Sequence, residues 1–240
     1  MRLAAIKVNN RGNSALISKE NRKFHERKQR ALRIVGVLRE LYPNVESALT
    51  YKNNWELLVS VVLSAQTTDR KVNEVTAELF KKYRSIHDYV KADLRVFESD
   101  IREIGLYRAK AKNILTAARI IKENYKGKLP HGMDEMIKLP GIGRKSANII
   151  LGNAYGIVEG IAVDTHVRRF ALKFDLTDSK DPNKIELDLM TLLPKKEWFY
   201  FTSRLIKYGR TICPARRHDC LDHPLTKIYP PAADRWISFR

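Results

Sequence analysis

The chain of 240 residues carries 45 Lys and Arg residues against 27 Asp and Glu residues, a formal net charge of +18, and 44% of its residues are hydrophobic. That apolar content excludes a wholly disordered chain, and no apolar run approaches the ~20 residues of a membrane span. The large positive charge favours a polyanionic partner, with nucleic acid first and an anionic membrane surface second.

The chain begins with a strongly basic segment. Residues 1–24 are rich in Lys and Arg and show little apolar periodicity up to about Lys23. This pattern predicts a flexible basic arm that could follow the phosphates of a nucleic acid. The segment also loosely resembles an organelle transit peptide, but it lacks the apolar stretch of a secretory signal. Two cysteines are too few for a disulfide scaffold, so we expect a cytoplasmic protein.

Beyond the arm, apolar residues recur almost everywhere at the spacing of an amphipathic helix. Strand-like alternation of apolar and polar residues is not convincing anywhere, and no repeat of fixed period stands out. The sequence therefore predicts an all-α fold. The predicted helical stripes fall at 31–42, 57–65, 72–83, 111–121, 147–154, 167–174, 185–192 and 198–205.

The most informative segment is Leu-Pro-Gly-Ile-Gly-Arg-Lys at residues 139–145. The proline ends a short helical stretch, and Gly141 and Gly143 permit a tight turn with open backbone N–H groups on either side of Ile142. A strong helix then begins at Arg144 and Lys145, so its free amides and positive dipole end are suited to bind a phosphate. An ordinary helix–turn–helix corner is the alternative interpretation.

This segment resembles the helix-hairpin-helix of the endonuclease III group of DNA glycosylases. The segments at 63–69, 104–107, 163–167 and 208–213 resemble that group's other motifs and occur in the same order. The resemblance covers about residues 27–230. It implies two helical domains, one formed by residues 51–155 and the other by residues 25–50 together with 156–240. The active site is then expected in the cleft between them.

The resemblance implies that Lys145 is the nucleophile and Asp164 the essential carboxylate. A lysine in the first turn of a helix, partly buried and beside Arg144, is disfavoured as an ammonium ion and could attack a sugar C1′. Asp164 could stabilise the positive charge that develops there. The alternatives are a surface phosphate contact for Lys145 and an N-cap role for Asp164, which could also serve both purposes.

The predicted activity is that of a bifunctional DNA glycosylase and AP lyase that removes oxidised pyrimidines of the thymine glycol type. Adenine-removing relatives carry a glutamate in the helix near Val61 and no lysine at the nucleophile position, and this chain differs at both places. A monofunctional mispair glycosylase or a non-catalytic DNA-binding relative is the alternative. The predicted partner is duplex DNA with oxidised pyrimidines or abasic sites. The protein is expected to be a monomer on DNA, in the nucleoid if the source is prokaryotic.

An enzyme that attacks a base must first flip it out of the helix. By resemblance, Gln66 and Leu106 fill the gap that the base leaves, and Asp69 and His166 match positions of the base pocket. For His166 a purely structural role is an equal alternative. The expected DNA contacts, beyond Gln66 and Leu106, come from Gly141, Ile142, Gly143, Arg144, Arg210, Arg216 and Arg217.

Most members of this family carry a four-iron, four-sulfur cluster near the C-terminus, with the ligand pattern Cys-x6-Cys-x2-Cys-x5-Cys. Cys213 and Cys220 match the first interval, whereas His223 and Tyr229 stand at the third and fourth ligand positions. We therefore predict that the cluster is absent, that the chain has no cofactor, and that this loop packs without metal. A zinc site from Cys213, Cys220 and His223, with His218 as a further donor, is the alternative. A disulfide between Cys213 and Cys220 is a second alternative.

Overall fold

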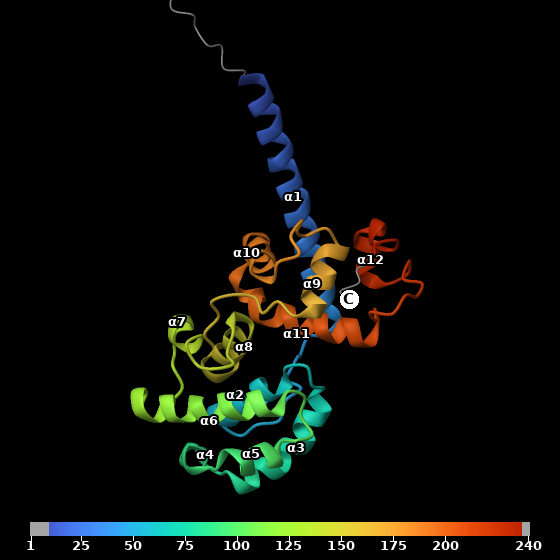
Figure 1. Cartoon of the computed structure of the whole chain (residues 1–240). Coiled ribbons are helices and arrows are strands. Elements are labelled where there is room, and N and C mark those ends of the chain that lie inside the picture. The colour runs from blue at the N-terminus through green and yellow to red at the C-terminus, as the bar shows by residue number, and fades with distance from the viewer. Residues whose placement is uncertain (1–9, 237–240) are drawn as a thin grey trace, which may run out of the picture.

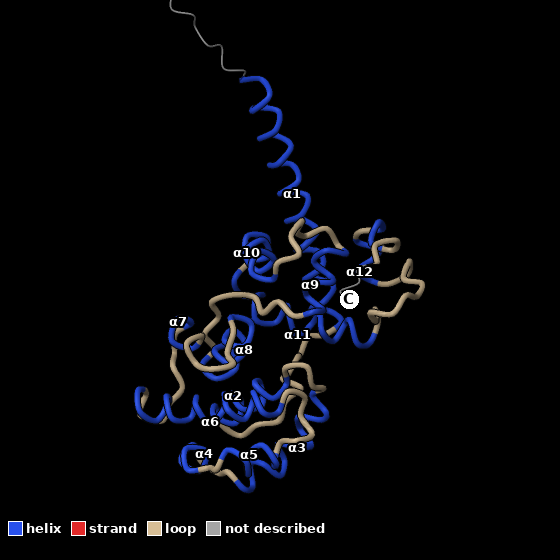
Figure 2. Tube along the Cα trace, viewed as in Figure 1, coloured by secondary structure: helices blue, strands red, loops and turns tan. Residues whose placement is uncertain are grey.

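The computed structural model describes the backbone of residues 10–236 and the side chains of residues 19–236. Every regular element in that part of the chain is helical (Figures 1 and 2). No helix among these residues is both long and apolar enough to cross a membrane. The elements are α1 (Asn10–Leu41), α2 (Asn54–Ser64), α3 (Asp69–Lys82), α4 (Ile86–Lys91), α5 (Leu94–Asp100), α6 (Tyr107–Asn124), α7 (Met133–Met136), α8 (Arg144–Tyr155), α9 (Thr165–Lys173), α10 (Pro182–Leu192), α11 (Lys195–Thr211), α12 (Pro224–Ile228) and the 3₁₀ turn η1 (Pro230–Ala232).

Helices α2 to α8 pack around one hydrophobic core, in the lower half of Figure 1. Helix α2 lies at its centre, because nearly all of its residues are apolar and it is buried on every side. Its start is set by Asn53, whose side chain accepts the Glu56 N–H. Helix α6 supplies the longest further stripe of buried residues, which are Ala111, Ile114, Leu115, Ala118 and Ile121.

The second core joins the two ends of the chain. Residues of α1 pack there against α10, α11 and α12, and α9 contributes to the same core, which lies above helices α2 to α6 in Figure 1. Its members from α1 are Ala31, Ile34, Val35 and Leu38, and its most deeply buried aromatic residues are Phe170, Phe174, Phe201 and Tyr208. The two separate cores support the predicted division into residues 51–155 and residues 25–50 with 156–240, whose boundaries stay a prediction.

The predicted flexible arm at 1–24 differs from the structure over part of its length. Helix α1 already begins at Asn10, and residues 1–9 of the arm lie outside the described residues. The prediction relied on apolar periodicity, which indicates that a helix packs against a core but does not detect a helix that is exposed to solvent on all sides. Once the packed part of α1 is formed, each added residue contributes a hydrogen bond at little cost, and the basic segment contains many good helix formers.

Ion pairs fasten α1 to the turn after α9. Arg27 Nη2 lies 2.9 Å from Asp175 Oδ1 and 2.7 Å from Asp178 Oδ1, and Arg30 Nη1 lies 3.1 Å from Asp175 Oδ2. Lys23 Nζ adds a 2.8 Å contact to Asp178. Four charged pairs thus hold the middle of α1 against the second core.

These pairs predict a dependence of stability on pH. Hydrogen bonds from Arg27 and Lys23 lower the pKa of Asp178 from 3.8 to about 2. The carboxylate therefore stabilises the fold above about pH 4, and this contribution is lost as the pH falls toward 2. Because the Asp178 side chain is 69% exposed, we expect this carboxylate to contribute less than about 1 kcal/mol to the free energy of unfolding. Urea denaturation measures the free energy of unfolding of the wild type and of Asp178→Asn. The difference between the two should shrink as the pH is lowered, and a constant difference would contradict this role of Asp178.

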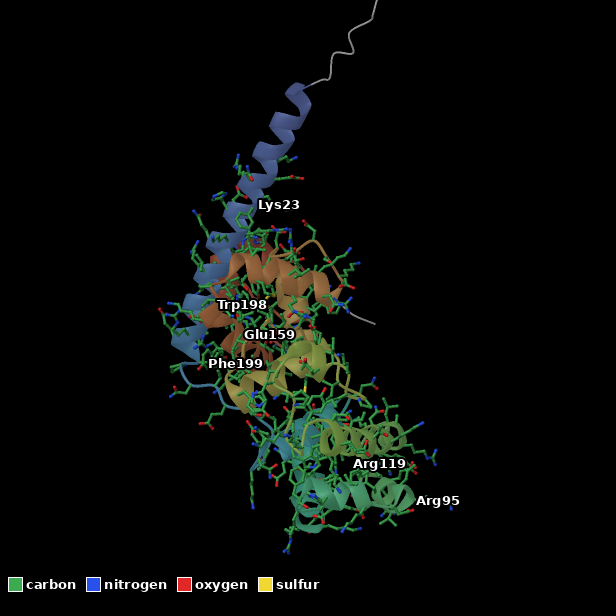
Figure 3. All side chains as sticks on the ribbon, turned by 90° about the vertical axis from the view of Figure 1, so that its left-hand side faces the viewer. Lys23, Arg95, Arg119, Glu159, Trp198 and Phe199 are labelled. Atoms are coloured by element: carbon green, nitrogen blue, oxygen red, sulfur yellow. The ribbon has the colours of Figure 1, made fainter. Side chains whose placement is uncertain are left out.

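The two halves meet along α8 and α11. A Cβ atom built on Gly152 of α8 would lie 2.4 Å from the ring of Phe199 on α11, so only glycine permits this approach. Figure 3 shows Phe199 at the level where the upper and lower halves join. This contact sets the distance between the helix that carries Lys145 and the second core.

Candidate functional site: a cavity beside the hairpin

The hairpin between α7 and α8 is built by its glycines. Gly141 has φ +79°, and a Cβ atom there would lie 2.8 Å from Asn113 Nδ2 on α6. Ile142 is 5% exposed and packs in the first core, and its N–H donates to the Leu139 carbonyl at 3.1 Å. The side chain and N–H of Ile142 are therefore used to hold the turn, and the DNA contact predicted for this residue stays a prediction.

The start of α8 is open to a ligand. Gly143 is its N-cap and supplies no side-chain partner, so the amides of the first turn are left for an anion. Lys145, in this turn, is exposed. The expected partial burial of Lys145 is thus wrong, because the helix presents its first turn to solvent at the edge of a cavity.

That cavity has a volume of about 690 Å³ and is lined from both halves of the molecule. Lys145 of α8 and Asp164, just before α9, both line it. Val61 of α2, Asp69 of α3 and His166 of α9 contribute further walls. The cavity therefore brings together the two predicted catalytic residues and the two predicted pocket residues, although they come from three separate segments, α3, α8 and the start of α9.

Asp164 has a structural role as well as a place in the cavity. It is the N-cap of α9, and its Oδ1 accepts the Val167 N–H at 2.8 Å. This bond fixes the carboxylate at the cavity wall. Both interpretations made from the sequence, N-cap and cavity carboxylate, therefore apply to the same side chain.

His166 lies partly buried beside this carboxylate. Burial lowers its pKa below the usual range, Asp164 opposes that shift, and the charges of Arg169, Arg210 and Lys145 add to it. The ring is therefore favoured in its neutral form at physiological pH. Its Nδ1 is buried and unpaired.

A glycine makes room for this imidazole. A Cβ atom on Gly209 of α11 would lie 2.3 Å from His166 Nδ1 and 3.0 Å from Arg169 Nη2. Only glycine therefore lets α11 approach α9 this closely, which explains physically why the predicted 208–213 motif contains it. The next residue, Arg210, forms an ion pair with Asp69 at 2.8 Å between the two halves. Arg210 and Asp69 thus close one side of the cavity.

The two predicted wedge residues share an unusual backbone conformation. Gln66 has φ +55° and Leu106 has φ +59°, the left-handed region that non-glycine residues rarely adopt. Leu106 is 60% exposed, and a Cβ atom on the preceding Gly105 would lie 3.3 Å from the Gln66 carbonyl oxygen. Their loops are therefore neighbours, and strain of this kind is typical of functional loops.

Sequence reasoning missed Lys110, which supports the Gln66 loop. This lysine is 5% exposed, and its Nζ donates to the carbonyls of Leu63, at 2.8 Å, and Ala65. It thereby satisfies the free carbonyls at the end of α2. Burial lowers its pKa. Its position four residues before Ile114 on the apolar stripe of α6 was the available signal.

Sequence reasoning also missed Glu186 of α10. Its carboxylate is 4% exposed, accepts Arg144 Nε at 2.7 Å and accepts Asn148 Nδ2 at 2.9 Å. This ion pair raises the pKa of Arg144 and ties the start of α8 to the second core. The Nε–H of Arg144, a residue predicted to contact DNA, therefore helps to position the hairpin.

Removing Glu186 should be costly. Glu186→Ala leaves the buried Asn148 amide unpaired, and we expect the free energy of unfolding to fall by about 1–3 kcal/mol. The matched control is Leu187→Ala on the same helix, where the side chain is 58% exposed and the loss should stay within about 0.5 kcal/mol. Chemical denaturation measures both. Equal small losses would show that the carboxylate does not hold the hairpin.

The C-terminal loop corrects the prediction of a loop that packs without metal and a chain with no cofactor. Cys213, His218 and His223 offer ligand atoms that all lie within 4.8 Å of one another, a group that could hold a metal ion. The alternative zinc site predicted from the sequence had Cys213, Cys220 and His223 as donors, with His218 as a further donor. Cys220 is not part of this group, and its Sγ lies 3.5 Å from Lys173 Nζ and 3.7 Å from the Ala233 carbonyl.

The donors of this loop can be compared with the cluster of the family. Four thiolates normally hold a four-iron, four-sulfur cluster. Tyr229, at the fourth ligand position, lies instead under the guanidinium of Arg30, 4.0 Å from ring to cation. One thiol and two imidazoles match a single ion of the zinc type better than they match that cluster. Arg216 and Arg217 are exposed in the same loop.

Comparisons with known proteins agree with the geometry. The family model "HhH-GPD superfamily base excision DNA repair protein" matches residues 59–195. Endonuclease III of Synechocystis sp. is 42% identical over 211 residues, which cover 88% of this chain and 96% of the relative. Endonuclease III of Bacillus subtilis is 43% identical over 190 residues, which cover 79% of this chain and 86% of the relative.

Solved structures give the same result. A non-covalent endonuclease III–DNA complex matches with a TM-score of 0.80 at 40% identity, covering 85% of this chain and 96% of that one. A trapped endonuclease III–DNA covalent intermediate matches with a TM-score of 0.79 at 41% identity, covering 84% of this chain and 94% of that one. The predicted all-α fold and the predicted family are confirmed. The chain belongs to the HhH-GPD superfamily of base excision DNA repair proteins and, within it, to the endonuclease III family.

Proposed function

We propose that the chain is a bifunctional DNA glycosylase and AP lyase that removes oxidised pyrimidines from duplex DNA. The observation that carries this proposal is the cavity that Lys145 and Asp164 both line, beside the open amides of α8. An amine can act as a nucleophile there, a carboxylate can stabilise positive charge, and helix amides can bind a phosphate. A protein that only binds DNA needs the phosphate site but not the amine and carboxylate.

The chemistry follows from these groups. The neutral amine of Lys145 attacks the sugar C1′, the glycosidic bond breaks, and the damaged base leaves with the bonding electrons and takes up a proton. Nζ then loses one proton, and its lone pair opens the sugar ring, whose O4′ takes up a proton, to give a protonated Schiff base between Nζ and C1′. Its positive charge acidifies the C2′ proton, and removal of that proton expels the 3′ phosphate by β-elimination. Asp164 stabilises the charge at C1′ and moves the lysine protons.

Access to the base requires flipping, which leaves a gap in the helix. The exposed Leu106 is suited to enter this gap as an apolar wedge, and Gln66 is suited to hydrogen-bond the base left without a partner. Asp69 and His166 line the cavity that would receive the flipped base. Gly141, Gly143, Arg144, Arg210, Arg216 and Arg217 are the proposed contacts to the DNA backbone.

The alternative without lyase activity is less well supported by the cavity. Val61 lines it from α2, at the place where the adenine-removing relatives carry a glutamate, so α2 supplies no acid there. The lysine at position 145 supports a covalent route instead. We propose further that the protein acts as a monomer on cytoplasmic or nucleoid DNA, which sedimentation of the chain with and without duplex would test.

A cleavage assay on a panel of duplexes tests the proposal. The duplexes carry thymine glycol, an abasic site, an adenine mispair or no lesion. We expect nicks at thymine glycol and at the abasic site without alkali. Nicks that appear only after alkali would indicate a monofunctional glycosylase, and binding without any nick would indicate a non-catalytic relative. Either result would overturn the proposed activity.

A further inference from the structure

The loop between α11 and α12 holds a compact group of metal-binding side chains outside the cavity. Cys213 follows the end of α11, His218 lies in the middle of the loop, and His223 is the N-cap of α12. Their ligand atoms lie within 4.8 Å of one another. The two imidazole rings are stacked, with centroids 5.1 Å apart and planes 29° apart. One thiol and two imidazoles thus converge from three points of the same loop.

The ring nitrogens of both histidines are free on the inner side. His218 Nε2 and His223 Nδ1 are buried and have no hydrogen-bond partner. The other ring nitrogen of His218, Nδ1, lies 2.7 Å from the Arg216 carbonyl. This contact requires a proton on Nδ1, so in the neutral ring the lone pair is on Nε2. A buried acceptor without a donor is costly, and a metal ion would satisfy both nitrogens.

The contact between His218 and Arg216 has the form that supports metal-bound histidines. Such residues almost always donate their second ring N–H to a carbonyl or a carboxylate, which fixes the ring and its tautomer. Cys213 has comparable support, because Arg169 donates to its carbonyl at 2.7 Å and lies 3.8 Å from its Sγ. Two of the three donors are therefore held in place by outer contacts.

The dimensions suit one small ion. Zinc binds thiolate at about 2.3 Å and imidazole at about 2.0–2.1 Å in tetrahedral sites, so its donors lie roughly 3.5 Å apart. The present separations need only small movements of side chains to reach that distance. Cys220 is engaged with Lys173 and Ala233 and supplies no fourth donor. The fourth position would belong to a solvent molecule.

We propose that Cys213, His218 and His223 bind one zinc ion, which fastens the loop 213–223 between α11 and α12. Binding replaces the thiol proton of Cys213 by the metal, so one proton is released. The ion closes two short segments of chain around the exposed Arg216 and Arg217. It thereby orders the two cations, which would otherwise lie in a loop of 11 residues without helix or strand.

Metal analysis of the full-length protein tests this site without reference to activity. We expect about one zinc ion per chain, measured by mass spectrometry of the metals. Cobalt exchanged for zinc should show the visible bands of a tetrahedral ion and thiolate-to-cobalt absorption in the near ultraviolet. Failure to bind zinc or cobalt would overturn the proposal. So would about four iron ions with sulfide per chain, because that content defines a cluster.

Variants identify the donors. His218→Asn and His223→Asn should each lose most of the bound metal, whereas Cys220→Ser should keep it. A chelator should lower the melting temperature of the wild type and of Cys220→Ser but leave that of His218→Asn unchanged, which separates metal loss from misfolding. Loss of zinc in Cys220→Ser with retention in His218→Asn would contradict the assignment. These readouts do not depend on glycosylase activity, so the two proposals fail separately.

Discussion

Lys145→Ala is expected to abolish strand cleavage at thymine glycol and at abasic sites. The variant lacks the amine that forms the Schiff base, and removal of a nucleophile costs on the order of 10⁴-fold or more in rate. The side chain is exposed at the start of α8 and is no part of either core, so the fold should not change. Single-turnover cleavage of labelled duplex measures the effect.

DNA binding separates loss of chemistry from loss of affinity. The helix amides, Gly141, Gly143 and the basic loop remain in Lys145→Ala, so the dissociation constant should rise less than about tenfold at moderate salt. Lys184→Ala is the matched control, because this exposed lysine lies on α10 and does not line the cavity. Wild-type cleavage in Lys184→Ala with none in Lys145→Ala is the expected pair of results. Cleavage within a few-fold of wild type in Lys145→Ala would rule it out as the nucleophile.

Asp164→Asn should give the second largest effect. The amide keeps an oxygen where Oδ1 accepts the Val167 N–H, but it carries no charge to stabilise C1′ or accept a proton. We expect a loss of about 10²–10⁴-fold in cleavage rate, the usual range for a general base or a charge at the transition state. The melting temperature should stay close to that of the wild type, because the N-cap is preserved.

Asp164→Ala distinguishes the two roles of this residue. It removes the N-cap as well as the charge, which costs about 1 kcal/mol of stability. Its rate should match that of Asp164→Asn while its melting temperature is lower. If Asp164→Asn cleaved like the wild type and only Asp164→Ala were affected, the residue would be an N-cap and no more.

Parts of the molecule with a local signature could be predicted from the sequence. The hairpin at 139–145 is marked by its glycines, and the helices are marked by apolar spacing. The stripe at 57–65 corresponds closely to α2, because an almost continuous apolar run allows one buried helix. The start of α1 could not be found in this way, because its basic segment forms a helix without packing an apolar face.

Residues that act across long sequence separations were not predictable. Glu186 lies 42 residues after Arg144, and nothing on α10 indicates that its carboxylate faces α8. From the sequence, Lys110 would be interpreted as a surface charge, because nothing near it indicates its contact with the end of α2. For the metal-binding group, the spacing of the cysteines suggested Cys220 as a donor and His218 only as a further one, whereas in the structure His218 lies close to Cys213 and His223. The conformation of the loop decides which donors come together, and the number of residues between them does not.

Several residues that the chemistry does not use directly position the two halves of the molecule against each other. Glu186 holds the start of α8, the Arg210–Asp69 pair closes one side of the cavity, and Gly209 brings α11 close to His166. Each of them sets the position of a cavity wall, although none is a nucleophile or base. A lysine at the edge of this cavity can serve as a nucleophile only if these contacts keep Asp164 in the wall of the same cavity.

Borohydride trapping on duplex DNA with thymine glycol tests the central claim most directly. Borohydride reduces a Schiff base to a stable amine, so the wild-type chain should become covalently attached to DNA. Peptide mass spectrometry should place the attachment at Lys145. No adduct with the native protein, or an adduct on Lys207, which also lines the cavity, would contradict the account.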